Sequence, residues 1–256
     1  MPRRRRELLK VRTVYGLRPV LEALRARPGE IEQLYVSQGE VPSRHAAEIF
    51  SRAREAGVRV QKLPRERLAT LAQGGVHQGV VAELRELDYA DVADLLEEAR
   101  SRRQPPLLVV LDGIQDPHNL GAIIRSAHAL GAHGVVIPKD RAVQVTGAVT
   151  KAAAGATEHT RIARVTNLSR ALEEMKEAGL WVAAAEPASD QALWDARLDG
   201  PLALVVGAEG SGVRENVLKH CDLKVRIPMA GKVASLNASV SAGLLLYEVA
   251  RQRAKG

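Results

Sequence analysis

Hydrophobic and polar residues along this chain follow two periods, one typical of strands and one typical of helices. Residues 31–36 and 107–111 are short apolar-rich runs of strand length, and the second is apolar throughout, as expected of a strand buried on both faces. Residues 43–56 instead carry apolar side chains three and four positions apart and stop before Gly57, a residue suited to a helix C-cap. The pattern therefore predicts an α/β protein.

The two periods recur in two series, one on each side of residues 88–106. Strands that alternate with helices favour a mainly parallel sheet in the second series, with ligands at the carboxyl ends of its strands. We expect helices at 19–27, 43–56, 64–72, within 88–106, through 123–131, at 168–178 and from about 237, and strands at 31–36, 58–61, 79–84, 107–111, 134–137, 160–165, 180–185, 203–206 and 223–227.

The segment at residues 88–106 predicts a domain boundary. Its one amphipathic helix is followed by Pro105 and Pro106, which stop a helix and stiffen the connection. A chain of 256 residues also exceeds a comfortable single core. We therefore expect a basic arm at 1–12, an N-terminal domain at 13–87, a linker with a short helix at 88–106 and a C-terminal domain at 107–256.

The composition is that of an ordinary globular protein, with 46 % hydrophobic and 26 % charged residues. No apolar run approaches the roughly 20 residues that a membrane helix needs. No hydrophobic segment follows the N-terminal arginines, so a signal peptide is not expected. The single cysteine, Cys221, excludes an internal disulfide framework and favours the reducing cytoplasm as the compartment.

The positive charge is concentrated at the N-terminus. Residues 1–18 hold seven basic groups against Glu7, so almost all of the net charge of +7 lies there. A basic arm on a near-neutral body fits a polyanionic partner, because phosphate contacts by lysine and arginine release counterions. A solubilising tail explains the charge equally well. Aromatic residues make up 3 % of the chain, which argues against an RNA reader built on stacked aromatic platforms.

A first polar loop, residues 112–121, follows the apolar run at 107–111. Asp112, Asp116 and His118 are metal-ligand types within seven residues. Aspartate in a turn rich in glycine and proline more often bonds the backbone and caps the next helix. We therefore expect no metal site.

A second loop, residues 207–212, spells G-x-x-G-x-G after the expected strand at 203–206. This order reverses the G-x-G-x-x-G of a dinucleotide-binding turn. Glu209 would also place a carboxylate where a pyrophosphate should lie, an unfavourable contact between like charges. The loop instead fits a small ligand approached closely by backbone amides.

The third loop, residues 227–239, leads into the expected terminal helix. Small residues at 238–243 allow other backbone segments to approach that helix closely. Ser235 and Asn237 are good helix-capping residues, and capping is the simplest explanation for them. Two polar residues on either side of Leu236, after a loop with glycine, also fit the lining of a pocket.

Three sequence blocks resemble the motifs of the SpoU/TrmH family of RNA 2′-O-methyltransferases, within the SPOUT superfamily. They are D-P-H-N-L-G-A-x-x-R-S at 116–126, G-A-E-G at 207–210 and I-P-M-x-G-x-x-x-S-L-N-x-S at 227–239. The segment from V-Y-G at 14–16 to H-Q-G-V-V-A at 77–82 resembles the substrate-binding domain of bacterial 23S rRNA guanosine-2′-O-methyltransferases. The resemblance covers nearly the whole chain beyond the basic arm.

This resemblance implies a fold that periodicity does not indicate. The C-terminal domain would be a mainly parallel α/β sheet tied in a deep trefoil knot, and the N-terminal domain a small L30e-like α/β unit that binds RNA. Threading of a chain through its own loop is rare. The small residues at 238–243 fit a helix packed through a tight opening.

The resemblance also implies methyl transfer from S-adenosylmethionine to a ribose 2′-hydroxyl. Backbone groups of Gly207, Ile227, Met229 and Leu236 would hold the cofactor. A guanidinium stays protonated, so we expect Arg125 to grip the RNA phosphate and stabilise the developing alkoxide while a nearby acceptor takes the proton. The catalytic pocket would contain Asn119, Arg125, Glu209, Ser235 and Asn237, although Asn119 and Glu209 are also suited to holding the loops together.

The implied partners are RNA, most specifically 23S rRNA, and a second copy of the chain in a homodimer; neither a membrane nor DNA is expected. The same chemistry on tRNA or on another rRNA nucleoside is an alternative. A non-catalytic RNA-binding module is a second alternative, although it would require a damaged motif and Asn119, Arg125, Glu209 and Asn237 are all present. A Rossmann-type nucleotide enzyme is disfavoured by the glycine order.

Overall fold

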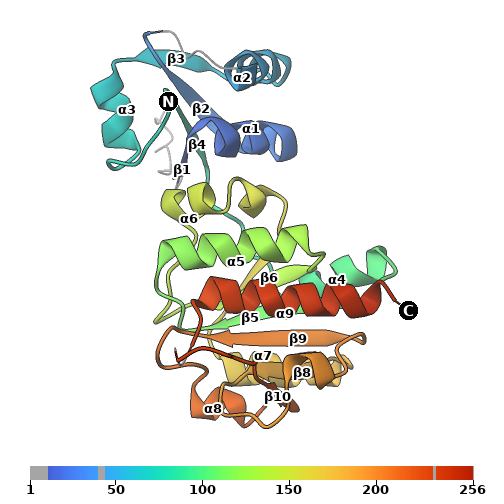
Figure 1. The fold of residues 1–256 in the computed structure, drawn as a ribbon. Coiled ribbons are helices and arrows are strands. Elements are labelled where there is room, and N and C mark those ends of the chain that lie inside the picture. The colour runs from blue at the N-terminus through green and yellow to red at the C-terminus, as the bar shows by residue number, and fades with distance from the viewer. Residues whose placement is uncertain (1–10, 40–43, 233–234, 256) are drawn as a thin grey trace, which may run out of the picture. The chain divides into compact units, whose positions relative to one another are not determined.

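The computed structural model describes residues 11–39, 44–232 and 235–255. The chain divides into two compact units (Figure 1). Unit 1 holds the chain up to Asp88 together with Val145–His159, and unit 2 holds Tyr89–Gln144 and the chain from Thr160 onward. Residues 1–10, which make up most of the expected basic arm, lie outside the described residues.

Unit 1 contains a four-stranded mixed sheet in the order β1-β4-β2-β3. Strand β4 pairs antiparallel with β1 and β2, and β3 lies at the edge, parallel to β2. The strands are β1 (Val11–Tyr15), β2 (Ile31–Ser37), β3 (Val60–Leu63) and β4 (Val80–Arg85), and the helices of this unit are α1 (Leu17–Ala26), η1 (Pro28–Glu30), α2 (Arg44–Glu55), α3 (Arg65–Leu71), α6 (Gly147–Ala152) and η2 (Ala156–Glu158).

The side chains of this sheet alternate between two cores, as the pleat requires. Val14, Leu34 and Ala82 face α1 and α2 in one buried cluster. Tyr15 and Val81 face α3 in the other, with Leu68 and Ala72.

The H-Q-G sequence at residues 77–79 forms a tight turn between α3 and β4. Gln78 and Gly79 both have positive φ, at 53° and 84°. The side chain of Gln78 accepts a hydrogen bond from the backbone N–H of Leu17 at 3.2 Å, and Nδ1 of His77 accepts one from the N–H of Gly79 at 3.1 Å. The turn therefore satisfies a free donor in the first turn of α1.

Arg12, which the charge pattern placed in the exposed basic arm, is instead a buried residue of β1. Its guanidinium makes a two-pronged contact with the carboxylate of Glu158, at 2.8 and 2.6 Å. The Glu158 side chain is fully buried. The sequence around Arg12 could not show that it differs from the other basic residues near the N-terminus, because its partner lies 146 residues away.

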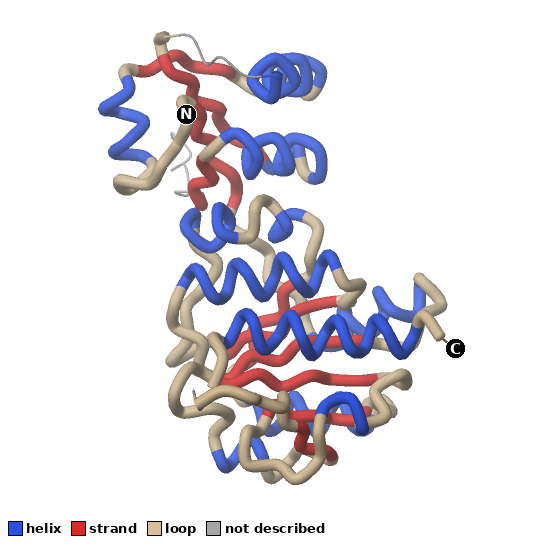
Figure 2. The backbone as a smooth tube through the Cα atoms, in the orientation of Figure 1, coloured by secondary structure: helices blue, strands red, loops and turns tan. Residues whose placement is uncertain are grey.

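Unit 2 contains a six-stranded sheet in the order β10-β8-β9-β5-β6-β7. Every pair is parallel, which confirms the expected sheet type, and Figure 2 shows the strands side by side. The strands are β5 (Leu107–Asp112), β6 (Gly134–Pro138), β7 (Ile162–Val165), β8 (Trp181–Ala185), β9 (Leu202–Gly207) and β10 (Leu223–Val225), and the helices are α4 (Val92–Ser101), α5 (Pro117–Ala129), α7 (Leu168–Glu177), η3 (Leu193–Asp195), α8 (Glu215–Leu218) and α9 (Ala238–Arg253).

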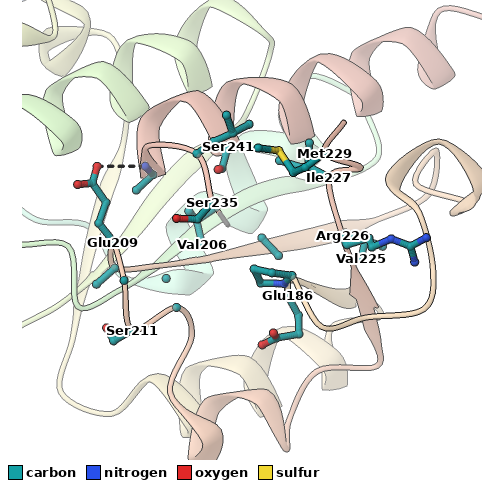
Figure 3. Close-up of a pocket in the computed structure, with 18 residues that line it drawn as sticks. Glu186, Val206, Glu209, Ser211, Val225, Arg226, Ile227, Met229, Ser235 and Ser241 are labelled. Atoms are coloured by element: carbon teal, nitrogen blue, oxygen red, sulfur yellow. Dashed lines mark hydrogen bonds between the residues drawn. The ribbon is translucent and has the colours of Figure 1, made fainter. Parts of the chain in front are cut away.

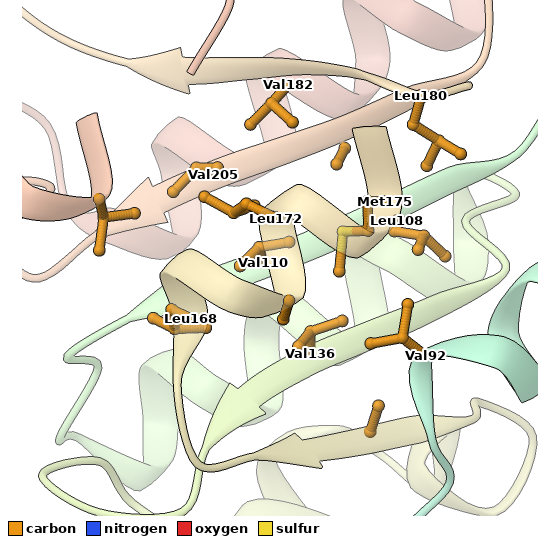
Figure 4. Packing of buried hydrophobic residues seen from close by; sticks show 14 of the residues in the cluster. Val92, Leu108, Val110, Val136, Leu168, Leu172, Met175, Leu180, Val182 and Val205 are labelled. Atoms are coloured by element: carbon orange, nitrogen blue, oxygen red, sulfur yellow. The ribbon is translucent and has the colours of Figure 1, made fainter. Parts of the chain in front are cut away.

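Helices cover both faces of this sheet, so its central strand β5 is buried along its whole length. Helices α4 and α7 pack on one face against Leu108, Val110 and Val136 (Figure 4). Helices α5 and α9 lie side by side on the other face (Figure 1). In the part of the chain that the structure describes, no helix is long and apolar enough to cross a membrane.

The two units divide the sequence differently from the expected domains at two places. Helix α4, expected within a linker, contributes Val92, Leu95 and Leu96 to the core of unit 2. Residues 145–159, expected within the C-terminal domain, belong to unit 1. Sequence periodicity could not indicate this second difference, because it depends on the packing of α6 on β1 and of η2 on α1, more than 100 residues away. The knot depends on threading and stays a prediction.

Candidate active site

A cavity of about 550 Å³ opens at the carboxyl ends of the strands in unit 2 (Figure 3). This is the end of a parallel sheet where ligands are expected, and the size is that of a small-molecule site. The lining comes from the segments after β8, β9 and β10 and from the start of α9: Ala185, Glu186, Pro187, Val206, Gly207, Ala208, Glu209, Gly210, Ser211, Gly212, Val225, Arg226, Ile227, Met229, Ser235, Leu236, Ala238 and Ser241.

The structure explains why the loop after β9 is rich in glycine. A Cβ on Gly207 would lie 2.0 Å from the backbone carbon of Gly212, so no other residue fits there. The N–H of Gly212 donates to the carbonyl of Ala208 at 2.9 Å and closes the loop. Gly210 and Gly212 both have positive φ. The loop is therefore a compact turn that presents backbone to the cavity.

Asp112, at the end of β5, anchors this loop from the neighbouring strand. Its buried carboxylate accepts from the backbone N–H and from Nε of Arg214, both at 2.8 Å. Asp116 accepts from the N–H of His118 at 2.9 Å and caps α5. These contacts are the roles that turn aspartates were expected to have. Among the described residues, no group of three or more histidine, cysteine or acidic side chains could hold a metal ion.

Three of the predicted catalytic residues form one hydrogen-bonded cluster. Nδ2 of Asn119 donates to Oε1 of Glu209 at 2.9 Å, and Nδ2 of Asn237 donates to Oδ1 of Asn119 at 2.9 Å and also to Oε1 of Glu209. The same Glu209 oxygen accepts from the N–H of Ala238 at 3.3 Å (Figure 3). The structure therefore brings all three motifs together at one point.

Asn237 serves both of the purposes that its sequence position suggested. Its Oδ1 accepts from the N–H of Ser239 at 2.9 Å and of Val240 at 3.3 Å, so it caps α9. Its Nδ2 belongs to the cluster with Asn119 and Glu209. Helix capping and placement of a polar amide at the site are thus one arrangement.

The remaining predicted residues divide between the cavity and the neighbouring surface. Gly207, Ile227, Met229 and Leu236 line the cavity, as does Ser235. Arg125 is exposed on α5 and does not line the cavity. Among the described residues no carboxylate pairs with Arg125, so its guanidinium is free to bind an anion.

Sequence reasoning missed the cavity wall after β8, which includes Glu186 and Pro187. The N–H of Glu186 donates to the carbonyl of Val225 at 2.9 Å, and the guanidinium of Arg226 donates to the carbonyl of Ser189 at 2.9 Å. These bonds hold the wall against β10. Its position in the sequence could have indicated it, because Glu186 directly follows the parallel strand β8, just as the predicted site residues follow other parallel strands.

Comparison with known proteins identifies the family. The model of the SpoU rRNA methylase family matches residues 106–247, and a model of the RNA 2′-O ribose methyltransferase substrate-binding domain matches residues 13–90. The chain belongs to the SpoU rRNA methylase family. It is therefore an S-adenosylmethionine-dependent RNA methyltransferase, and the resemblance seen in its motifs is confirmed.

Relatives and solved structures agree with this membership. The chain is 45 % identical over 240 residues to a TrmH family tRNA/rRNA methyltransferase, YacO, of Bacillus subtilis, covering 94 % of this chain and 95 % of the relative. It is 42 % identical to the 23S rRNA (guanosine-2′-O-)-methyltransferase RlmB of Coxiella burnetii, covering 95 % and 97 %. The SpoU methyltransferase AviRb of Streptomyces viridochromogenes is similar in structure, with a TM-score of 0.80 at 27 % identity over 96 % of this chain and 91 % of that one.

The cavity of this SpoU methylase fits the family's cofactor. A second structure of AviRb holds AdoMet, and its TM-score to this chain is 0.78. Here Val206, Ile227 and Leu236 offer apolar surface for an adenine ring, and the glycine turn admits close backbone contacts. The carboxylates of Glu186 and Glu209 favour a cofactor that carries sulfonium and ammonium charges.

Proposed function

We propose that this chain methylates the ribose 2′-hydroxyl of a guanosine in 23S rRNA. The observation that carries the proposal is the Asn119–Glu209–Asn237 cluster beside the cofactor-sized cavity. The choice of nucleotide rests on relatives at 40–42 % identity that are named 23S rRNA guanosine-2′-O-methyltransferases. Relatives of this kind match the chain over nearly its whole length, including the N-terminal domain.

S-adenosylmethionine supplies an already activated methyl group, so the protein's main task is to align the attacking oxygen. Backbone groups of Gly207, Ile227, Met229 and Leu236 would hold the cofactor in the cavity. The Asn119–Glu209–Asn237 cluster fixes the mouth of the cavity, because Glu209 ties the loop after β9 to the start of α5 and to the start of α9.

Arg125 would bind the RNA phosphate next to the target ribose and stabilise the negative charge that develops on the 2′-oxygen. It cannot act as a base, because a guanidinium keeps its proton. The proton would pass to a nearby acceptor, and the carboxylate of Glu209 is the anionic group of the cluster. Ser235, exposed at the rim, is suited to contacting the ribose.

We infer that the chain works as a homodimer. Val240, Leu244 and Tyr247 are 49 %, 41 % and 62 % exposed and recur at helical spacing along α9. An apolar stripe of this kind on a surface helix favours burial against another protein surface. A second copy of the chain is the proposed occupant, and sedimentation of the wild type and of a Leu244→Asp, Tyr247→Asp variant tests it. We also infer the trefoil knot and a cytoplasmic location, both from the family.

The decisive experiment is methyl transfer from labelled S-adenosylmethionine to unmodified 23S rRNA and, in parallel, to tRNA. A 2′-O-methyl group makes the adjacent phosphodiester bond resistant to alkali, so partial alkaline hydrolysis locates the modified nucleotide. Resistance at one guanosine of 23S rRNA is expected. Transfer to tRNA alone would overturn 23S rRNA as the proposed substrate but would leave the proposed reaction, ribose 2′-O-methylation, in place. Cofactor binding without transfer to either RNA would favour a non-catalytic RNA-binding module.

A further inference from the structure

The turn between α3 and β4 in unit 1, residues 73–79, has an unusual backbone and an exposed tip. Gln73 and Gln78 adopt positive φ of 50° and 53°, a region that glutamine rarely occupies. Val76 at the tip is 70 % exposed, the most exposed of the large hydrophobic side chains in the described chain. Strained backbone of this kind tends to persist where the turn has a function.

Lys151 reaches this turn from α6, 75 residues further along the chain. Its Nζ donates to the backbone carbonyl of Val76 and lies 5.3 Å from the centre of the Tyr15 ring. A Cβ on Gly147 would lie 2.4 Å from the carbonyl oxygen of Thr13, so α6 packs closely on β1. The segment that returns to unit 1 thus delivers a cation to the turn.

Arg65, at the start of α3, adds a second positive charge. Burial lowers the pKa of His77 within the turn, and the nearby charges of Arg65 and Lys151 lower it further. Two cations, Arg65 and Lys151, therefore lie near the turn, and Lys151 contacts it directly. In the part of unit 1 that the structure describes, no carboxylate pairs with either Arg65 or Lys151.

Several other arginines of unit 1 instead pair with carboxylates. Arg25 pairs with Glu22 and Glu48, and Arg85 pairs with Glu32 at 2.9 Å. Arg12 is buried against Glu158. The turn therefore combines uncompensated cations with an exposed apolar tip, which is the chemistry of a surface that contacts a phosphate backbone and the ribose or base beside it.

We propose that the surface formed by Arg65, Val76 and Lys151 is where unit 1 binds the backbone of the RNA substrate. The inference rests on the proposed function, because it takes RNA as the substrate. The two cations would contact phosphates and set the position of the RNA without reading its sequence. Arg65 and Val76 come from the N-terminal segment of unit 1, and Lys151 comes from the segment 145–159, so both segments are needed to form the surface.

The test uses the full-length chain and compares an Arg65→Gln, Lys151→Gln variant with the wild type, on unmodified 23S rRNA transcript and on tRNA. Loss of two phosphate contacts should raise the RNA KM roughly tenfold and reduce the slope of log affinity against log salt by about 1.5 to 2. The kcat at saturating RNA and the Kd for S-adenosylmethionine should not change. The matched control is Arg25→Gln, Arg85→Gln, which removes the same charge from ion-paired positions and should leave the KM within about twofold.

Exposed Val76 provides a second measurement that does not depend on Lys151 packing. Val76→Lys should strengthen RNA binding and steepen the salt slope, whereas Val76→Glu should weaken binding. If all these variants bind RNA with the wild-type affinity and the wild-type salt slope, the proposed RNA-binding surface is wrong, and the proposed function is unaffected. A wild-type protein that methylates neither RNA would instead overturn the proposed function, and this surface with it.

Discussion

The side-chain amide of Asn119 lies 2.9 Å from Oε1 of Glu209, although 90 residues separate them in the chain. The same oxygen also accepts from the side chain of Asn237 and from the N–H of Ala238. One carboxylate oxygen therefore connects the start of α5, the loop after β9 and the start of α9. A charged acceptor makes each of these bonds stronger than a neutral one would.

Replacement of Glu209 should slow methyl transfer through loss of this shared acceptor. We expect Glu209→Ala to lower the single-turnover rate by about 100-fold, a typical cost for losing one preorganised polar group at a reacting centre. Glu209→Gln keeps an acceptor oxygen without the charge and should fall between Ala and wild type. A Glu209→Ala variant that transfers methyl at the wild-type rate would contradict the proposed role.

Arg125→Ala should abolish detectable transfer while leaving cofactor binding nearly unchanged, because Arg125 lies on α5 outside the cavity lining. Calorimetry measures the Kd for S-adenosylmethionine, and labelled methyl transfer measures activity. Arg125→Lys is the informative companion variant. It keeps the charge but loses the planar fork that binds phosphate in two places, so a partial rate is expected. Normal turnover by Arg125→Ala would remove this residue from the proposed site.

The Asp112–Arg214 pair predicts an asymmetric effect on stability. The Asp112 side chain is fully buried, whereas the Arg214 side chain is 47 % exposed. Arg214→Ala leaves a buried carboxylate without its cation and should lower the free energy of unfolding by about 3 kcal/mol. Adding Asp112→Asn to that variant should recover part of the loss, since it replaces the uncompensated charge with a neutral amide. Urea denaturation measures all three proteins; a double variant less stable than Arg214→Ala would rule out this account.

His133 predicts a loss of stability in mild acid. Burial lowers its pKa, as do Arg102 and Arg253, and its Nδ1 accepts from the N–H of Leu107 at 3.0 Å. The folded pKa thus lies below the ordinary value of 6.5. The unfolded chain takes up the proton first, so this contribution is complete above pH 6.5 and decreases as pH falls from 6.5 towards the folded pKa.

Thermal denaturation between pH 7.5 and pH 5 measures this effect. His133→Asn keeps an acceptor near the N–H of Leu107 and does not titrate, so its Tm should fall less over this range than that of the wild type. His77 has a lowered pKa for a similar reason and should leave some of the decrease in place. Parallel curves for the two proteins would show that His133 does not contribute.

Local pattern predicted most of the elements that form the site. The apolar run at 107–111 became the buried strand β5. The loop at 207–212 lies beside Ile227, Met229, Ser235 and Leu236 of the third loop, because parallel strands end at the same edge. Glu186 was missed, although it follows β8 in the same way. Its segment contains no glycine-rich pattern. It also lies outside the three sequence blocks that resemble the family motifs.

Features that depend on distant partners were beyond local pattern. Arg12 counts as one more basic residue until Glu158, 146 residues later, is seen to pair with it. Asp112 similarly looked like a turn aspartate, and only the fold shows that it holds Arg214 across 102 residues. Buried ion pairs carry no periodic signal, because what determines them is the three-dimensional neighbourhood.

The return of residues 145–159 to unit 1 decides how this protein can be recombined with its relatives. The peptide chain passes between the two units three times, near residues 88, 144 and 159. Consider a hybrid that takes only its N-terminal segment from a relative. Glu158 would then lose its own Arg12 as a partner, and Lys151 would lose its own turn at Val76. A graft of the whole of unit 1 must therefore carry two pieces of sequence, one before and one after the segment of α4, β5, α5 and β6.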